Sequence, residues 1–263
     1  AISIVLLESY SDTYVYLSSR DASRGAEAKN AILNKHPEFA HRISNIVLDV
    51  ANDNSVKSAA KKIGESLSAR RACLYGIVNN AGIAYSDDGV TGVIEVNTHG
   101  PKRVIDEFAP LLEREGGRVV NVSSASGPNY LSRCDEQIRD VLTDQNVSWD
   151  NINSLIEAFS SNYQFASGKD RERIMGDVYG FTKACTNALT MFLAKQHPHL
   201  KINACTPGYI ETDMTAPFAM QRGIAPSELG MKKPRDGALS SVFLLMHENP
   251  GSGFYFGSDC MRS

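Results

Sequence analysis

A tyrosine and a lysine four residues apart, Tyr179 and Lys183, are the residues of this chain best suited to proton transfer. Apolar residues recur at helical spacing from Tyr179 to Lys195, which predicts a helix with both side chains on one face. A phenol ordinarily titrates near pH ~10, and a neighbouring ammonium favours the phenolate. A tyrosine tuned in this way can give a proton to a forming alkoxide, or take one from an alcohol, near neutral pH. The pair by itself also fits an exposed surface helix, so its meaning depends on the rest of the chain.

Length and composition narrow the class of protein. The 263 residues are enough for a single α/β domain over 1–263, and the net charge of −3 argues against a dedicated nucleic-acid binder. No apolar run of about 18 residues exists, so no membrane span is expected. Five scattered cysteines without a CxxC pair predict free thiols in a reducing compartment and no zinc site. We therefore expect a cytoplasmic protein without a metal.

The segments that must position Tyr179 and Lys183 have sequence patterns typical of strands and helices in alternation. Strands are expected at 13–18, 45–50, 74–78, 117–122, 201–205 and 253–256. Helices are expected at 1–9, 21–35, 54–69, 90–115, 179–195 and 236–246. This alternation predicts an α/β fold, a doubly wound (Rossmann-like) parallel sheet with helices on both faces. In such sheets ligands bind outside the carboxyl ends of the strands.

Polar or turn-forming residues follow the expected strands at those carboxyl ends. They are Ser19-Arg20, Asp49, Asn79-Asn80-Ala81-Gly82, Ser123-Ser124 and Pro207-Gly208. Asn97 lies inside the expected helix 90–115. Each of these residues alone also fits a turn, a helix cap or a buried polar group. Their shared order and placement predicts one functional site.

At these residues the sequence resembles the short-chain dehydrogenase/reductase superfamily, and within it the monomeric NADPH-dependent carbonyl reductases. The resemblance rests on the spaced motifs Asn79-Asn80-Ala81-Gly82, Val96-Asn97, Asn121-Val122-Ser123-Ser124, Tyr179-Gly180-Phe181-Thr182-Lys183 and Pro207-Gly208-Tyr209-Ile210-Glu211-Thr212-Asp213-Met214. It implies four catalytic residues. Ser124 would hydrogen-bond the substrate carbonyl and Tyr179 would donate the proton. Lys183 would lower the tyrosine pKa and bind the nicotinamide ribose, and Asn97 would hold a water in a proton relay to Lys183.

The resemblance also implies where the cofactor and the substrate would bind. The cofactor would contact Arg20, Asp49, Val50, Asn80, Ala81, Gly82, Tyr179, Lys183, Pro207, Gly208, Ile210 and Thr212, and the substrate would contact Ser124, Tyr209 and Met214. NAD enzymes of this kind place an acid after the second strand, where this chain has Ser19 followed by Arg20. A guanidinium suits the extra 2′-phosphate, although Asp21 is close by, so we expect NADPH rather than NADH.

One element of the resemblance is missing from this sequence. The glycine-rich turn between the first strand and the first helix should hold the pyrophosphate, yet residues 1–9 match the helix that follows that turn. We expect that upstream residues precede Ala1, and the alternative is a protein that lacks the element. Without the central strand, we expect a gap in the sheet with unpaired backbone groups.

An insertion separates Ser124 from Tyr179. It spans about 126–176 and is longer than in most of the superfamily. Apolar stripes predict two helices, one through Ile152, Leu155, Ile156 and Phe159 with Ser148 as cap, and a shorter one through Ile138, Val141 and Leu142. Residues 161–177 are polar and are expected to form a loop. The resemblance implies that the insertion makes the protein a monomer, and the alternative is a surface excursion without effect on assembly.

The function expected from all of this is reduction of a ketone, aldehyde or quinone by NADPH. Segment 215–233 is expected to be either a mobile lid or an ordinary long loop. The partner would be a small-molecule carbonyl, with neither nucleic acid nor membrane. Two alternatives stay open: an alcohol- or steroid-type dehydrogenase with the same site, and a catalytically silent relative that acts as a binding scaffold.

Overall fold

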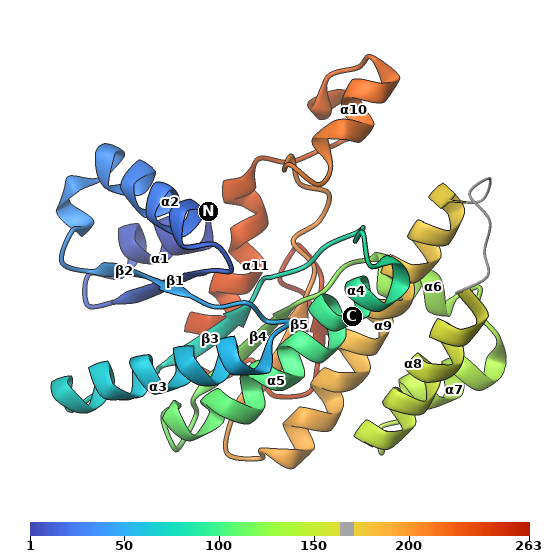
Figure 1. The fold of residues 1–263 in the computed structure, drawn as a ribbon, viewed down its shortest axis with the longest axis horizontal. Helices are drawn as coiled ribbons and strands as arrows, with labels where there is room; N and C mark the ends of the chain where they lie inside the picture. Colours follow the sequence, from blue (N-terminus) through green and yellow to red (C-terminus); the bar gives the residue numbers. More distant parts are fainter. Residues whose placement is uncertain (164–170) are drawn as a thin grey trace.

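Parallel strands and helices alternate through the structure, a computed structural model that describes residues 1–163 and 171–263 (Figure 1). The strands are β1 (Val15–Ser19), β2 (Ile43–Val47), β3 (Gly76–Asn79), β4 (Arg118–Val122), β5 (Lys201–Cys205) and β6 (Tyr255–Phe256). The α-helices are α1 (Ile2–Ser9), α2 (Ala22–Lys35), α3 (Asp53–Arg70), α4 (Gly89–Ile94), α5 (Gly100–Phe108), α6 (Ser126–Leu131), α7 (Glu136–Thr143), α8 (Trp149–Tyr163), α9 (Arg171–Gln196), α10 (Ala216–Arg222) and α11 (Pro234–Met246). The predicted Rossmann-like fold is confirmed.

The strands form two separate parallel sheets. One has the order β1-β2 and the other β3-β4-β5-β6, and no ladder joins them within the described residues. β1 pairs with β2 alone and β3 with β4 alone, so each has one edge without a strand partner in this part of the chain. The expected gap in the sheet is therefore present, between the strand that carries Ser19 and the strand that ends at Asn79.

Helices cover both faces of the larger sheet because its strands are apolar on both sides. Neighbouring residues of a strand point to opposite faces. Val119 accordingly packs in the cluster that contains α5 and α9, whereas Val120 packs in the cluster that contains α1 and α11. α3 joins the α5 side through Val104 and Phe108. The carboxyl ends of the strands are left for polar residues.

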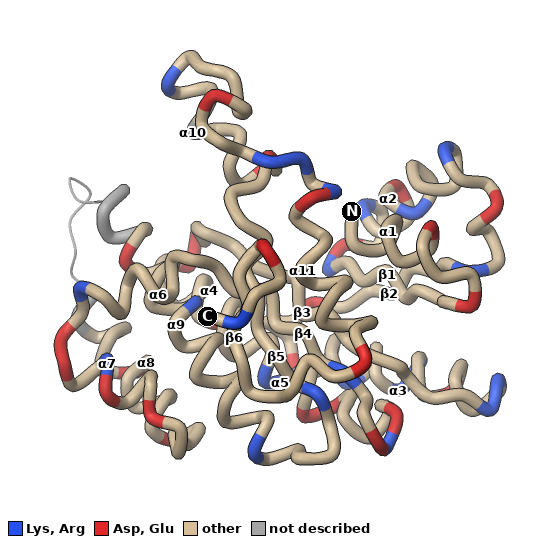
Figure 2. The backbone as a smooth tube through the Cα atoms, turned by 180° about the vertical axis from the view of Figure 1, so that it is seen from behind, with Lys and Arg blue, Asp and Glu red and all other residues tan. Residues whose placement is uncertain are grey.

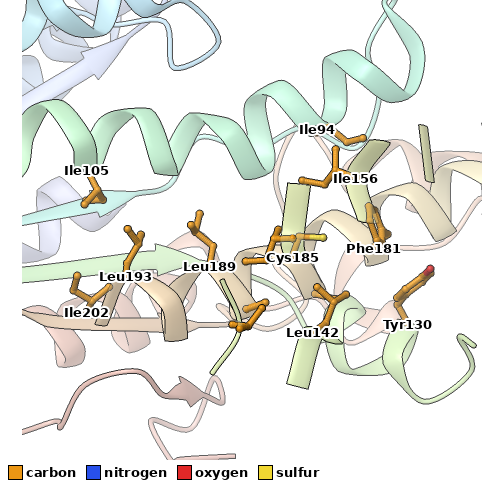
Figure 3. Close-up of a cluster of buried hydrophobic side chains, with 14 of the residues drawn as sticks. Ile94, Ile105, Tyr130, Leu142, Ile156, Phe181, Cys185, Leu189, Leu193 and Ile202 are labelled. Atoms are coloured by element: carbon orange, nitrogen blue, oxygen red, sulfur yellow. The ribbon is translucent and has the colours of Figure 1, made fainter. Parts of the chain in front are cut away.

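The largest apolar core lies around α9, the helix that carries Tyr179. Figure 3 shows Ile105, Leu189, Leu193 and Ile202 gathered where α5, α9 and β5 meet. Helix α8 of the insertion adds Phe159, whose ring stacks on that of Phe181 with 3.9 Å between centroids. α9 is thus packed from both sides and held in one orientation.

Both apolar stripes predicted for the insertion form helices, α7 and α8. Ile152, Ile156 and Leu142 are buried, and the hydroxyl of Ser148 accepts a hydrogen bond from the N–H of Asn151 at 3.1 Å, as a helix cap does. These predictions depend only on local periodicity, which explains why they are confirmed.

The largest departures from the predicted boundaries are in two helical regions. The loop expected over 161–177 is helical at both ends, because α8 continues to Tyr163 and α9 begins at Arg171; residues 164–170 lie outside the described part. Charged residues are good helix formers, so polarity alone did not indicate a loop there. The helix expected over 90–115 contains a π-helical turn at Glu95–His99 and ends in a 3₁₀ turn at Ala109–Leu111.

Acidic and basic residues are both distributed along the outer elements of the fold (Figure 2). In the described part of the chain, no helix is both long and apolar enough to cross a membrane. The five cysteines are free.

Candidate active site

Ser124 and Tyr179 meet at the carboxyl end of β4. The hydrogen-bonded ladder between β4 and β5 continues one residue past the end of β4, where the N–H of Ser123 donates to the carbonyl of Cys205 at 2.7 Å. The Ser123 hydroxyl then donates to the carbonyl of Lys183 at 3.2 Å, which ties this turn to α9. Ser124 follows directly and forms a hydrogen bond with Tyr179. The predicted pair of hydroxyls is therefore brought together.

Two glycines allow α6 and α9 to cross with their backbones in contact. A Cβ on Gly127 would lie 3.0 Å from the backbone carbon of Lys183, and one on Gly180 would lie 3.0 Å from the backbone oxygen of Ser126. Contacts this short are tighter than nine in ten of those that real Cβ atoms make, so a side chain at either position would require the neighbouring backbone to shift by a few tenths of an ångström. This close crossing sets the distance between Ser124 and Tyr179.

The pKa of Tyr179 moves in the direction opposite to our expectation. Burial raises it above the ordinary value, and the hydrogen bond with Ser124 lowers it by a smaller amount. Lys183 does not act on it as predicted, since its Nζ atom donates to the carbonyl of Val122 at 2.8 Å and lies 5.6 Å from the Tyr179 ring centroid. In this structure the phenol is held in its neutral form.

Lys183 is a cation buried beside the site. Its exposed fraction is 4%, and burial lowers its pKa from 10.5 to about 8. Gly82 lies next to it: a Cβ at this position would be 3.3 Å from Lys183 Nζ and 3.4 Å from Asn97 Oδ1. The predicted Asn79–Gly82 motif thus places the backbone of Gly82, which has no side chain, next to the Lys183 ammonium and the Asn97 amide.

Asn97 sits in the π-helical turn, a feature often found at functional sites. Its Oδ1 accepts from the N–H of Ile83 at 2.9 Å, and its Nδ2 donates to the carbonyl of Ile83 at 2.9 Å and to Thr182 Oγ1 at 3.1 Å. The side chain therefore fastens the segment after Gly82 to α9. Its expected role in holding a water stays a prediction.

Three buried threonines on α9 are residues that sequence reasoning missed. The Thr182 hydroxyl donates to the carbonyl of Tyr179 at 2.9 Å and accepts from Asn97. Thr186 donates to the Asn97 carbonyl at 3.0 Å, and Thr190 accepts from Asn121 of β4 at 2.9 Å. Their spacing of four residues on one helix face was a usable signal. Together they fix how α9 seats against the π-helical turn and the sheet.

The residues expected to hold the adenosine half of a dinucleotide lie on the smaller sheet. Arg20 is exposed just after β1, and Asp21 caps α2 by accepting from the N–H of Arg24 at 2.8 Å. Asp49 and Val50 follow β2; Asp49 Oδ1 accepts from the N–H of Ala51 at 3.0 Å. Asn80 and Ala81 are exposed after β3 on the other sheet. The two groups are at carboxyl ends, as predicted, but on sheets that are not hydrogen-bonded to each other.

The Pro207–Met214 segment follows β5 and leads to α10, which projects from the body of the molecule (Figure 1). Gly208 has φ of 87° and needs to be glycine. The Ile210 side chain is buried, and a Cβ on Gly237 of α11 would lie 2.7 Å from it, so it faces that helix. Thr212 is exposed and its N–H donates to Thr215 Oγ1 at 2.9 Å.

The expected substrate contacts Tyr209 and Met214 are exposed by 41% and 37%. Both side chains are therefore open to solvent, and their contact with a substrate stays a prediction. Among the described residues, no group of three or more His, Cys, Asp and Glu side chains is arranged to hold a metal ion.

Comparison with known proteins finds similar proteins among the short-chain dehydrogenases and reductases. Residues 7–134 match the model of the short chain dehydrogenase family. The chain is 28% identical to (+)-neomenthol dehydrogenase of Arabidopsis thaliana, over 92% of this chain and 86% of that protein. It is 27% identical to carbonyl reductase [NADPH] 1 of Rattus norvegicus, over 88% of this chain and 81% of the relative.

The fold agrees with these sequence matches. The solved structure of menthone neomenthol reductase from Mentha piperita superposes with a TM-score of 0.76 at 23% identity, covering 98% of this chain and 93% of that one. The chain is thus similar to the short-chain dehydrogenases/reductases, which are oxidoreductases, and among them it resembles the carbonyl reductases.

Proposed function

We propose that this protein uses NADPH to reduce a carbonyl group to an alcohol, with Tyr179 as the proton donor. The observation that carries the proposal is the half-buried, neutral phenol of Tyr179, hydrogen-bonded to Ser124 and one helical turn from the Lys183 ammonium. The likeness to a neomenthol dehydrogenase and to NADPH carbonyl reductases supports the same chemistry.

Each of these side chains has a distinct task in the proposed reaction. The substrate oxygen accepts hydrogen bonds from Ser124 and Tyr179, which stabilise the charge that develops on it. Tyr179 keeps its proton at neutral pH, because burial raises its pKa, and it transfers that proton to the oxygen as the carbon is reduced. Lys183 keeps an ammonium group 5.6 Å from the centroid of the Tyr179 ring.

The residues at the carboxyl ends fit a dinucleotide. Gly82 leaves its backbone free beside Lys183 Nζ, where a side chain would crowd the ammonium. Arg20 is an exposed guanidinium after β1, suited to an added phosphate. When bound, the nicotinamide would supply the hydride. Lys183 would hold its ribose, as the resemblance implies.

The test is Tyr179→Phe. Turnover of a ketone panel should fall by at least about a hundredfold, because general-acid catalysis contributes about 10²–10⁴ in rate. NADPH binding, measured by calorimetry, should stay near the wild-type value. Tyr75→Phe is the matched control: Tyr75 is exposed ahead of β3, and its ring contact with Arg118 survives the change. Full activity in Tyr179→Phe would refute the proton-donor role.

A second candidate is a binding protein without catalysis. It is favoured by the separation of the β1–β2 sheet, which carries Arg20 and Asp49, from the sheet that leads to Ser124. The two candidates differ in a direct measurement on this chain. Micromolar binding of NADPH with weaker binding of NADH supports the reductase, whereas no binding of either dinucleotide supports the scaffold.

We further propose that the protein is a monomer acting on a small-molecule carbonyl in the cytoplasm. Helices α7 and α8 pack against α9 through Leu142, Ile156 and Phe159, so the insertion covers that face of the helix. Sedimentation at several protein concentrations checks this, and a stable dimer would contradict it.

A further inference from the structure

A second serine lies beside the hydroxyl that is proposed to activate the carbonyl. Ser126 is two residues beyond Ser124, at the first position of α6. Ser124 Oγ donates to Ser126 Oγ at 3.2 Å, and the N–H of Ser126 donates back to Ser124 Oγ at 3.1 Å. Both serines are half-buried. Tyr179, Ser124 and Ser126 therefore form a row of three hydroxyl groups.

Counting hydroxyl hydrogens shows what this row can still donate. A serine has one hydroxyl hydrogen to give. The hydroxyl hydrogen of Ser124 is directed to Ser126 Oγ. The hydroxyl hydrogen of Ser126 has no acceptor among the described residues. The Ser126 backbone N–H holds Ser124 Oγ in place whichever way the Ser124 hydrogen points. Ser126 consequently keeps one hydrogen for a ligand that enters beside Ser124.

We propose that Ser126 is a specificity-determining residue that selects carbonyl compounds with a second oxygen on the neighbouring carbon, above all vicinal dicarbonyls. The proposal rests on the proposed reductase function. The two oxygens of a cis vicinal dicarbonyl are about one hydrogen-bond length apart, which matches the 3.2 Å between the two serine oxygens. One oxygen would accept from Ser124 and Tyr179, and the other from Ser126.

The reaction changes only one of the two carbonyls. The hydride adds to the carbon next to Ser124, the C=O π electrons move to its oxygen, and that oxygen takes the proton of Tyr179. The product is an α-hydroxy ketone, whose remaining carbonyl keeps its hydrogen bond from Ser126. A simple ketone of the same shape leaves the Ser126 hydroxyl without this partner.

The experiment compares a rigid pair of substrates, camphorquinone and camphor, with the full chain and NADPH. Camphorquinone holds its two oxygens cis and cannot enolise, and camphor has the same skeleton with one oxygen. The readout is kcat/KM for the dione divided by kcat/KM for the ketone. Ser126→Ala should lower this ratio about fivefold, which corresponds to about 1 kcal/mol for one neutral hydrogen bond. Comparing ratios between variants cancels the greater intrinsic reactivity of the dione.

Matched variants separate recognition from structure. Ser126→Thr retains a hydroxyl and should keep the ratio. Ser132→Ala, which removes a hydroxyl bonded only to the Asn129 carbonyl at the other end of α6, should leave it unchanged. An equal loss on both substrates in Ser126→Ala would mean that Ser126 merely positions Ser124, and it would overturn the proposal.

The remaining outcomes separate this proposal from the function on which it rests. An unchanged ratio in Ser126→Ala, with activity intact, refutes the selection of dicarbonyls and leaves the reductase standing. The selection of dicarbonyls is also refuted, and the reductase function retained, if the wild-type chain reduces other ketones but neither camphorquinone nor 2,3-butanedione. A wild-type chain that binds no dinucleotide and reduces no carbonyl refutes both.

Discussion

The buried ammonium of Lys183 should make the protein less stable than it would be without that charge. Its pKa falls from 10.5 to about 8 on burial. At about 1.4 kcal/mol per pH unit, this difference is roughly 3 kcal/mol against the charged form in the folded state. Lys183→Met removes this penalty. It also removes the bond to the Val122 carbonyl, and the loss of that donor costs about 1–3 kcal/mol.

The sign of the pH dependence follows from the two pKa values. Below pH about 8, Lys183 is charged in both states, so the penalty is fully present. Between about 8 and 10.5 the unfolded chain binds the proton and the folded chain does not, so stability rises with pH. Above 10.5 the penalty is absent. The stability of Lys183→Met relative to wild type should therefore fall by roughly 3 kcal/mol from pH 7 to pH 10.5.

Urea unfolding of both proteins at steps from pH 7 to 10.5 measures this difference and cancels the groups that they share. Lys195→Met is the matched control, since Lys195 is exposed on the same helix and bonds Asn146 Oδ1 at 2.6 Å. A stability difference from wild type that changes with pH is expected for Lys183→Met and not for Lys195→Met. A Lys183→Met difference that is constant over this range would refute the buried charge.

Three further outcomes are expected. Gly127→Ala should destabilise the protein by about 1–3 kcal/mol and lower kcat without weakening NADPH binding, because the new Cβ pushes α6 from α9; thermal unfolding and kinetics check this. Thr182→Val should cost about 1–3 kcal/mol of stability and reduce kcat, because Asn97 Nδ2 loses one of its two acceptors, while Thr182→Ser should retain wild-type stability and kcat; equal values for the two variants would contradict this. Arg20→Glu should move the ratio of NADPH to NADH dissociation constants toward NADH in calorimetry, and an unchanged ratio would remove the argument for a phosphate site there.

The parts of the fold that were predicted correctly are those with a local signal. Apolar periodicity found α8 and its cap at Ser148, and strand patterns found β4 and β5 nearly to the residue. Polarity misled where helix-forming charged residues extend α9 back to Arg171. The π-helical turn around Asn97 has no periodic signal, since one extra residue in a turn leaves the apolar pattern almost unchanged.

Tyr179 and Lys183 share a helix face because of their spacing, and that is a property of the sequence by itself. The same is true of Ser124 standing at the end of a buried strand, next to a small-residue segment. These features depend on residues that are neighbours along the chain, so the composition of the candidate site and its family resemblance were visible without coordinates.

Only the tertiary structure decides the electrostatics of that site and its supporting contacts. Burial raises the pKa of Tyr179 and lowers that of Lys183, and burial depends on α6 crossing α9 at Gly127. The bond from Asn97 to Thr182 joins residues 85 apart. Such effects are set by distances between distant segments and by exclusion of water, and neither quantity is encoded in any local stretch of the chain.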